Sequence, residues 1–233
     1  MRRVLFLVPL ACLALLAAKA QDPVKVAGDL YKVIIENDSV RVLDLNIPAA
    51  AKTAVHSHPD LVAIVLEPTT IRWTRPDGKS EQSGPGFTRG SVLYMPSETH
   101  ISENIGTTSV HVILVEFKKP APILWRNPSF PAPYKHVAEN PHATVFEAIV
   151  APGGAVPKHT HGDDIIVSLT DATAEVTDEK GKKQAVTFKK DTATYAGLVT
   201  HSWVNTGQTP VHLIVVELKD LSGFDARSGA LLR

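Results

Sequence analysis

Apolar and polar residues alternate along much of this chain, in short segments bounded by glycine and proline. The segment 39–45 alternates with a period of two, as expected of a strand with one buried face. Residues 61–66 form a short apolar run, and residues 71–74 lead into Arg-Pro-Asp-Gly at 75–78, a signal for a hairpin turn. No segment of either half shows a sustained helical period with caps. The pattern therefore predicts an all-β fold of the sandwich or barrel type.

The same pattern occurs twice in the chain. His-Ser-His at 56–58 recurs as His-Thr-His at 159–161, an offset of 103 residues. After the loop at 84–86, where a change of length costs little, the offset is 101, and His100 then matches His201. Chance similarity between β-rich segments is the alternative, but the matches run in the same order through both halves. The repeat predicts two small antiparallel β-barrels in tandem.

A proline-rich segment separates the two copies. Proline lacks the backbone N–H that a sheet or helix needs, so residues 119–134 are expected to form an extended connector. We expect five segments along the chain: a signal peptide at 1–20, an N-terminal barrel at 21–118, the connector at 119–134, a C-terminal barrel at 135–220 and a C-terminal tail at 221–233.

The first twenty residues have the order of a secretory signal peptide. Residues 1–3 are short and basic, residues 4–18 form an apolar run of fifteen residues, and Ala-Lys-Ala at 18–20 is a small-x-small cleavage signal. An uncleaved anchor is the alternative, but the run is short for a membrane span. We therefore expect cleavage after Ala20, a periplasmic or secreted protein, and no membrane span after cleavage.

Composition narrows the chemistry of the mature chain. The only cysteine, Cys12, lies in the predicted signal peptide, so a metal site must use nitrogen and oxygen ligands. The whole chain has 24 basic and 24 acidic residues, and removing Arg2, Arg3 and Lys19 leaves a formal charge of −3. Because no long basic run survives, nucleic acid is not an expected partner.

Six of the ten histidines fall into two equivalent triads. Residues two apart on a strand point to the same face, so two imidazoles of a His-x-His pair can converge on one ion. A third histidine follows later in each half. We therefore expect divalent metal ligation by His56, His58 and His100 in the first half and by His159, His161 and His201 in the second half.

At these residues the chain resembles the cupin superfamily. The usual first motif of that family is His-x-His followed by glutamate, and the second has a Gly, a Pro six residues on, and a His followed four residues later by Asn. The matching residues are His56, His58, Gly90, Pro96, His100 and Asn104 in the first half and His159, His161, His201 and Asn205 in the second half. The resemblance covers residues from about 33 to 219 and implies a two-domain cupin, or bicupin, with a signal peptide.

The two halves depart from the family pattern in different ways. Where the family has glutamate, the first half has Leu61 and the second half has Asp164, a shorter carboxylate that we expect to be a fourth metal ligand. The second half has Asp191 and Gly197 in place of the Gly and Pro of the second motif. Tyr94 and Tyr195 are equivalent and precede the third histidine, so they are weaker candidates for pocket lining, with barrel packing as the alternative.

The function expected from these features is that of a metal-dependent enzyme acting on a small oxygen-bearing molecule. The metal is Mn, Fe, Ni or Zn, and the reaction is that of an oxygenase, a decarboxylase, an isomerase or a lyase, among which the motifs do not choose. Oxalate decarboxylases and quercetin dioxygenases share the two-domain architecture that the resemblance implies. Two alternatives remain: a non-catalytic protein that binds a metal or small ligand, and a protein in which one barrel supports packing of a homodimer.

Overall fold

The computed structural model describes residues 21–68, 70–84, 87–121 and 130–219, together with the backbone at 224–225 and 230–231. The predicted signal peptide, part of the predicted connector and most of the predicted tail lie outside the described residues. Within them, antiparallel strands and one short helix, α1 (Pro23–Val26), make up the regular structure, which confirms the all-β prediction. No helix in the described ranges is long and apolar enough to cross a membrane.

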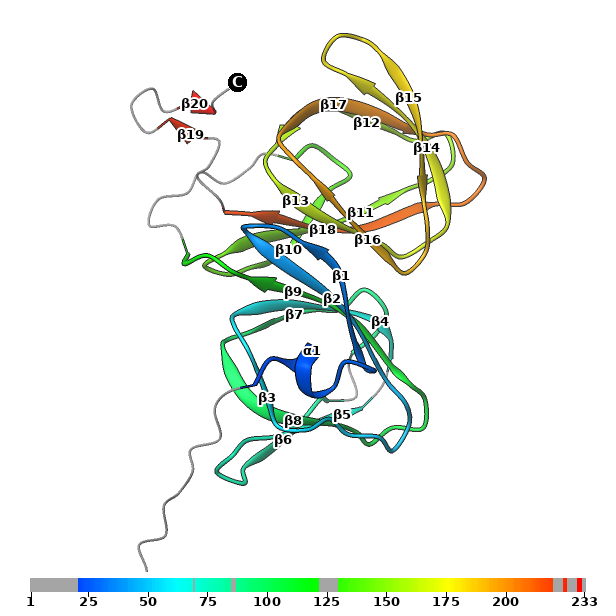
Figure 1. Cartoon of the computed structure of the whole chain (residues 1–233). Helices are drawn as coiled ribbons and strands as arrows, with labels where there is room; N and C mark the ends of the chain where they lie inside the picture. The colour runs from blue at the N-terminus through cyan, green and yellow to red at the C-terminus, as the bar shows by residue number, and fades with distance from the viewer. Residues whose placement is uncertain are drawn as a thin grey trace, which may run out of the picture.

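The first barrel consists of two sheets that curve around one interior (Figure 1). The five-stranded sheet has the order β1-β2-β9-β4-β7, and the four-stranded sheet has the order β3-β8-β5-β6. The strands are β1 (Tyr31–Glu36), β2 (Val40–Ile47), β3 (His56–His58), β4 (Leu61–Glu67), β5 (Ile71–Thr74), β6 (Ser80–Gln82), β7 (Val92–Met95), β8 (Glu98–Asn104) and β9 (Val110–Phe117).

The second barrel repeats this topology strand for strand. Its sheets have the orders β10-β11-β18-β13-β16 and β12-β17-β14-β15. The strands are β10 (Lys135–Glu139), β11 (Ala143–Val150), β12 (Ala155–His161), β13 (Asp164–Ser168), β14 (Ala172–Asp178), β15 (Lys183–Phe188), β16 (Thr192–Ala196), β17 (Val199–Asn205) and β18 (Val211–Leu218). Beyond them, β19 (Phe224–Asp225) and β20 (Ala230–Leu231) pair with each other.

Alternate residues of the five-stranded sheets point into the barrels. Leu43 and Leu45 of β2 and Leu114 of β9 belong to the core of the first barrel. Phe146 of β11 and Val215 of β18 belong to the core of the second barrel. The period-two pattern of the sequence therefore records which residues face each interior.

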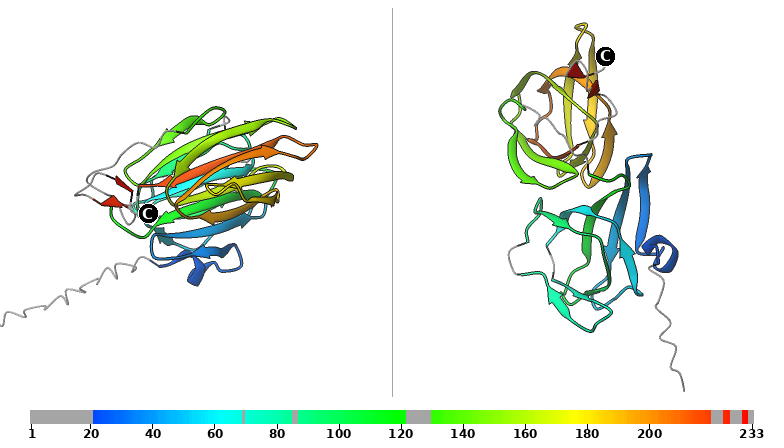
Figure 2. Two further views of the ribbon diagram at one scale, coloured as in Figure 1. Left: turned by 90° about the horizontal axis from the view of Figure 1, so that it is seen from above. Right: turned by 90° about the vertical axis from the view of Figure 1, so that its left-hand side faces the viewer.

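A third apolar core lies between the barrels, where the two five-stranded sheets pack face to face (Figures 1 and 2). Central contributors are Val42, Ile64 and Val115 from the first barrel and Val145, Ile165 and Val216 from the second. The apolar run at 61–66 is explained by this arrangement, because β4 buries one face in its own barrel and the other against the second barrel.

Two equivalent turns meet across the interface between the barrels. Gly90 has φ of 86° and Asp191 has φ of 62°, so the second copy keeps the left-handed backbone although it lacks the glycine. Aspartate tolerates this region better than most residues. Asp191 forms an ion pair with Arg89, which also donates a hydrogen bond to the carbonyl oxygen of Leu169. The departure from the family motif at Asp191 thus preserves the turn and adds a contact between the barrels.

Candidate metal centres

One antiparallel strand pair assembles each histidine triad. β3 pairs with β8 so that His56 lies opposite His100, and β12 pairs with β17 so that His159 lies opposite His201. The second histidine of each His-x-His pair shares the face of the first. In each triad the ligand nitrogens lie within 4.8 Å of one another. The structure thus brings together the six predicted histidines in two groups that can hold a metal ion.

Hydrogen bonds at Nδ1 orient most of these rings. The Nδ1 partners in the first triad are the carbonyl oxygen of Ala54 for His56, Oε1 of Glu116 for His58 and Oε1 of Glu98 for His100, at 2.8, 2.6 and 2.9 Å. In the second triad, Nδ1 of His159 lies 2.8 Å from the carbonyl oxygen of Pro157. Partners of this kind fix the tautomer and leave Nε2 as the ligand atom.

The buried nitrogens of the second triad fit a divalent transition metal. Nε2 of His159 and Nε2 of His201 are buried without a hydrogen-bond partner. An unpaired polar atom in a protein interior is costly and points to a missing ligand or ion. Three converging imidazole nitrogens are a donor set that suits Mn, Fe, Ni or Zn. The residues of both triads therefore match the predicted cofactor class.

A tyrosine stands beside the ligand atom of the first triad. The hydroxyl of Tyr31 lies 2.9 Å from Nε2 of His56, and the side chain is fully buried. Burial raises the pKa of Tyr31, and the nearby charge of Glu116 raises it further, so the phenol stays protonated. Tyr31 is therefore a hydrogen-bond donor at the centre of the triad.

The equivalent tyrosine of the second barrel, Tyr134, comes from the end of the connector. Its ring lies 5.6 Å from that of His159, and burial raises its pKa to about 12. Phe130 stacks on His161 with a centroid distance of 5.8 Å and packs against Phe146 at 4.4 Å. The first barrel has the small Ala27 at the position of Phe130, so a second aromatic ring, in addition to the tyrosine, packs on the triad only in the second barrel.

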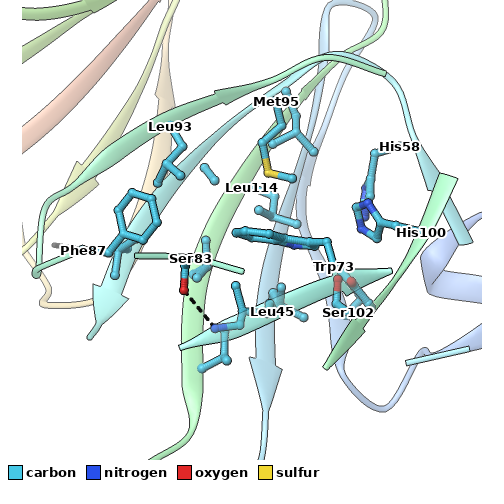
Figure 3. Close-up of a pocket in the computed structure, with 17 residues that line it drawn as sticks. Leu45, His58, Trp73, Ser83, Phe87, Leu93, Met95, His100, Ser102 and Leu114 are labelled. Carbon is cyan, nitrogen blue, oxygen red and sulfur yellow. Dashed lines mark hydrogen bonds between the residues drawn. The ribbon is translucent and has the colours of Figure 1, made fainter. Parts of the chain in front are cut away.

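An apolar cavity of about 60 Å³ adjoins the first triad (Figure 3). His58 and His100 form one end, and Trp73, Met95 and Phe87 are among the aromatic and apolar residues along its length. Further polar side chains in the wall are those of Tyr31, Ser83 and Ser102. A small molecule can therefore place a polar end at the histidines and an apolar part in the cavity.

Next to each triad, three neighbouring strands of the five-stranded sheet place one side chain each in a row, and the charges in this row differ between the barrels. In the first barrel, Glu116 lies between Arg41 of β2 and Leu61 of β4 in the strand register. Arg41 donates from Nε to Oε2 of Glu116 at 2.5 Å, and Oε1 of Glu116 faces His58. Arg41 also contacts Asp22 at 2.8 Å. Glu116 is thus held between a cation and a metal-ligand candidate.

In the second barrel the same row carries two carboxylates and no arginine. Glu217 lies between Thr144 and Asp164 in the register of β11, β18 and β13. Oδ2 of Asp164 lies 3.0 Å from Nδ1 of His161, and Oε1 of Glu217 accepts a hydrogen bond from the amide of Gly162 at 3.0 Å. The other oxygens, Oδ1 of Asp164 and Oε2 of Glu217, are buried without a partner.

The pKa values follow these environments. Burial would raise the pKa of Glu116, but its hydrogen bonds with His58 and Arg41 lower it overall. Burial, together with a smaller contribution from the charge of Asp164, raises the pKa of Glu217 to about 7. Burial also lowers the pKa of His56 and of His201 to about 4, which keeps both rings neutral as metal ligation requires.

The structure places the remaining predicted site residues away from the triad centres. Asp164 lies behind His161 at its Nδ1, and direct ligation by Asp164 stays a prediction. Tyr94 is 37% exposed and donates to Asp60, and Tyr195 is 42% exposed. Both tyrosines therefore lie on the outer faces of β7 and β16, neither at the cavity nor in a core, because Leu93 and Met95 are the residues of β7 that point inward.

Sequence reasoning missed Tyr31, Tyr134 and the role of Arg41. The repeat contains a signal for the tyrosines, because the offset of 103 aligns Tyr31 with Tyr134. Asn104 and Asn205, which complete the second motif, are structural. The side-chain amide of Asn104 donates to the carbonyl oxygens of Ile47 and Thr108, and Asn205 makes the equivalent bonds in the second barrel.

Solved structures with this architecture support the assignment of the fold. AerE from Microcystis aeruginosa has a TM-score of 0.55 and 15% identity, over 82% of this chain and 98% of that chain. The cupin 2 conserved barrel domain protein from Leptotrichia buccalis has a TM-score of 0.50 and 11% identity, over 81% and 88% of the two chains. Its fold is the cupin fold. The predicted tandem of cupin barrels is therefore confirmed as an architecture.

Oxalate decarboxylases are also among the similar structures. The enzyme of Lactobacillus farciminis, solved as a formate complex, has a TM-score of 0.55 and 12% identity, over 79% of this chain and 78% of that chain. The Bacillus subtilis oxalate decarboxylase, which has Mn(II) centres, has a TM-score of 0.53 and 13% identity, over 79% and 70% of the two chains. No protein-family model matches this chain, and a comparison with curated protein sequences gives no match. At these identities the likeness establishes the fold alone.

Proposed function

We propose that this chain is an exported bicupin enzyme of the cupin superfamily that uses a divalent transition metal to transform a small oxygen-bearing molecule in its first barrel. The observation that carries the proposal is the meeting of three elements there: three buried histidines, a protonated tyrosine at their ligand atoms and an apolar cavity beside them. A metal ion bound at such a site supplies Lewis acidity toward a substrate oxygen.

The residues of the first barrel have separate roles in this proposal. His56, His58 and His100 hold the ion, and the carboxylate of Glu116 fixes the ring of His58. The hydroxyl of Tyr31 donates a hydrogen bond to the substrate oxygen and stabilises negative charge that develops on it. The walls of the cavity hold the apolar part of the substrate and exclude water.

The second barrel is proposed to bind the same class of metal without turning over substrate. Phe130 stacks on His161 where the first barrel has Ala27, so less room remains beside the second triad. The metal is Mn, Fe, Ni or Zn. Manganese has the support of the Mn(II) centres of a structurally similar oxalate decarboxylase.

The alternative is a non-catalytic protein that captures a metal or a small ligand. The observation in its favour is Leu61, an apolar residue at the position where the family has its glutamate. A site without that carboxylate binds ligands at open metal positions but lacks an acid or base on that side of the ion.

Metal analysis followed by a reaction screen tests the proposal. Protein purified without added metal should contain a divalent transition metal, and oxygen uptake or decarboxylation should be detected with small acids, alcohols or carbonyl compounds. His58→Ala should abolish turnover, whereas Tyr94→Phe, a change on the outer face, should leave it intact. Metal binding without turnover in the full screen would favour the non-catalytic alternative. Mass spectrometry of protein from the native compartment should show a chain that begins at Gln21.

A further inference from the structure

The two triads have the same three ligands, but the carboxylates beside them are paired with arginines only in the first barrel. In the first barrel each carboxylate that touches a histidine of the triad is also paired with an arginine. Glu116 contacts Arg41 at 2.5 Å, and Glu98 contacts Arg75 at 3.1 Å. Each arginine has a further carboxylate partner, Asp22 on Arg41 and Glu81 on Arg75, but these are 30% and 67% exposed and are screened by solvent. The negative charges next to the first triad are therefore compensated by the protein itself.

The carboxylates of the second barrel have no such compensation. The partners of Asp164 and Glu217 are the imidazole of His161 and the amide of Gly162, and Thr144 stands where the first barrel has Arg41. Both carboxyl groups are buried, and each has one oxygen without a hydrogen-bond partner. When ionised, two buried carboxylates beside a triad supply a counter-charge for one divalent ion, and the charge of the ion would itself favour their ionised form.

A bound divalent ion thus has a different net environment in each barrel. In the second barrel its two positive charges are balanced by Asp164 and Glu217. In the first barrel the charge is not balanced by the protein, and the ion faces the apolar cavity, where electrostatic attraction is weakly screened. An anionic oxygen ligand is therefore favoured at the first site and disfavoured at the second.

We propose that the first barrel binds a short aliphatic monocarboxylate, with its carboxylate at the histidine triad and its hydrocarbon tail in the cavity lined by Trp73, Met95 and Phe87. This inference rests on the proposed function, because it requires a metal at the first triad. A dicarboxylate such as succinate does not fit as well, since the second charge, at the far end of its tail, would be buried among apolar side chains without a partner.

The size of the cavity limits the tail. A cavity of about 150 Å³ holds benzene in an engineered protein core. The cavity here measures about 60 Å³, which is room for a chain of roughly three carbons beyond the carboxylate. Butyrate has that length, 1-butanol has a comparable tail without the charge, and succinate has the same length with a second charge at the end of its tail.

Calorimetric titration of zinc-loaded protein with these three probes tests the inference. Butyrate should bind with a stoichiometry of one per chain and more tightly than 1-butanol or succinate. Leu61→Asp places in the first barrel the carboxylate that the second barrel has at Asp164, and it should weaken butyrate binding by about tenfold or more while zinc is retained. Leu61→Asn is the matched control, because it has the same size and polarity without the charge, and it should retain butyrate binding.

Histidine variants assign the site. His58→Ala should remove one zinc and all butyrate binding, and His161→Ala should remove the other zinc and leave butyrate binding in place. Equal effects of Leu61→Asp and Leu61→Asn, equal affinities for butyrate and 1-butanol, or butyrate binding that survives His58→Ala would each overturn the inference. Zinc at the first triad without butyrate binding would overturn this inference alone, whereas failure to bind any metal there would also overturn the proposed function.

Discussion

The hydroxyl of Tyr31 lies 2.9 Å from Nε2 of His56, the atom that would bind a metal. In the metal-free protein the hydroxyl donates a hydrogen bond to this buried nitrogen. A metal ion bound at Nε2 would free the hydroxyl to donate to a substrate oxygen. Tyr31→Phe should therefore leave metal affinity equal or higher. It should lower the turnover number by roughly 10²-fold, as expected for loss of one donor to a developing negative charge.

Steady-state kinetics and metal titration of the same variant separate these effects. Tyr134→Phe is the matched control, because it makes the same change in the second barrel and should leave the turnover number unchanged. A loss of metal affinity in Tyr31→Phe that accounts for the whole loss of activity would show that the hydroxyl supports the site rather than the substrate.

Equivalent glutamates should respond in opposite directions to the same substitution. In the folded protein the pKa of Glu217 is raised to about 7, so its protonated form is favoured. Glu217 therefore contributes most to the free energy of unfolding below its pKa in the unfolded chain, 4.5, and this contribution is lost as the pH rises through 7. At pH 8, Glu217→Gln should stabilise the metal-free protein by up to about 3 kcal/mol, and at pH 4 by little.

Glu116→Gln should instead destabilise the metal-free protein at pH 8. The pKa of Glu116 is lowered in the folded state, so its contribution is present above the unfolded pKa and is lost only in acid. Breaking its buried contacts with Arg41 and His58 should cost about 3 kcal/mol. Urea denaturation at pH 4 and pH 8 measures the free energy of unfolding of both variants. If both substitutions change it in the same direction at pH 8, the charge difference between the barrels is contradicted.

The second triad should bind a divalent ion more tightly than the first. Asp164 and Glu217 neutralise an ion there. In the first barrel Leu61 stands at the position of Asp164, and Arg41 pairs with Glu116, the equivalent of Glu217. His161→Ala should remove the tighter class of metal and His58→Ala the weaker class. Asp164→Asn should weaken the second site by about 10-fold to 100-fold without emptying it, because it removes both a charge and the anchor of His161.

Competition titration with a chromophoric chelator measures the two classes. If His58→Ala removes the tighter class and Asp164→Asn changes nothing, the carboxylates do not set the affinity. Pro96, which precedes the strand of His100 and has Gly197 as its counterpart in the second barrel, would then be the deciding feature.

Removal of the metal should lower the melting temperature. An ion that binds only the folded chain stabilises it by about 2.7 kcal/mol at a hundredfold excess over its dissociation constant. For a chain of this size, that corresponds to about 5–10 °C. Calorimetry with and without excess chelator measures the difference, with metal content determined in both samples. An unchanged melting curve in protein that has lost its metal would show that the triads do not stabilise the fold.

The fold was largely predictable because the repeat and the period-two pattern encode it locally. Strand direction, the pairing of the His-x-His strand with the strand of the third histidine, and the six histidines all follow from spacing along the chain. The apolar run at 61–66 was recognisable as a strand. Both faces of this strand are buried because the second barrel covers one of them. The sequence of one segment does not show which part of the chain packs against it.

Tertiary neighbours explain why the rest of the site was not predicted. Tyr31 lies 25 positions from His56 and Arg41 lies 75 positions from Glu116, so no local motif joins them. The position of Tyr94 just before His100 predicts that it lines a pocket, but the alternation of β7 turns it outward. The motif predicts Asp164 as a metal ligand but does not predict its contact with Nδ1 of His161, which depends on the fold.

The apolar core between the barrels joins two copies of one surface, because β2, β4 and β9 of the first half face β11, β13 and β18 of the second. A contact of this kind is isologous, and the tandem chain is in effect a dimer whose subunits share one polypeptide. Either half produced alone would present this face to solvent and would self-associate through it. Duplication of an ancestral single-barrel dimer would supply such an interface ready-made, after which the two sites were free to diverge in charge.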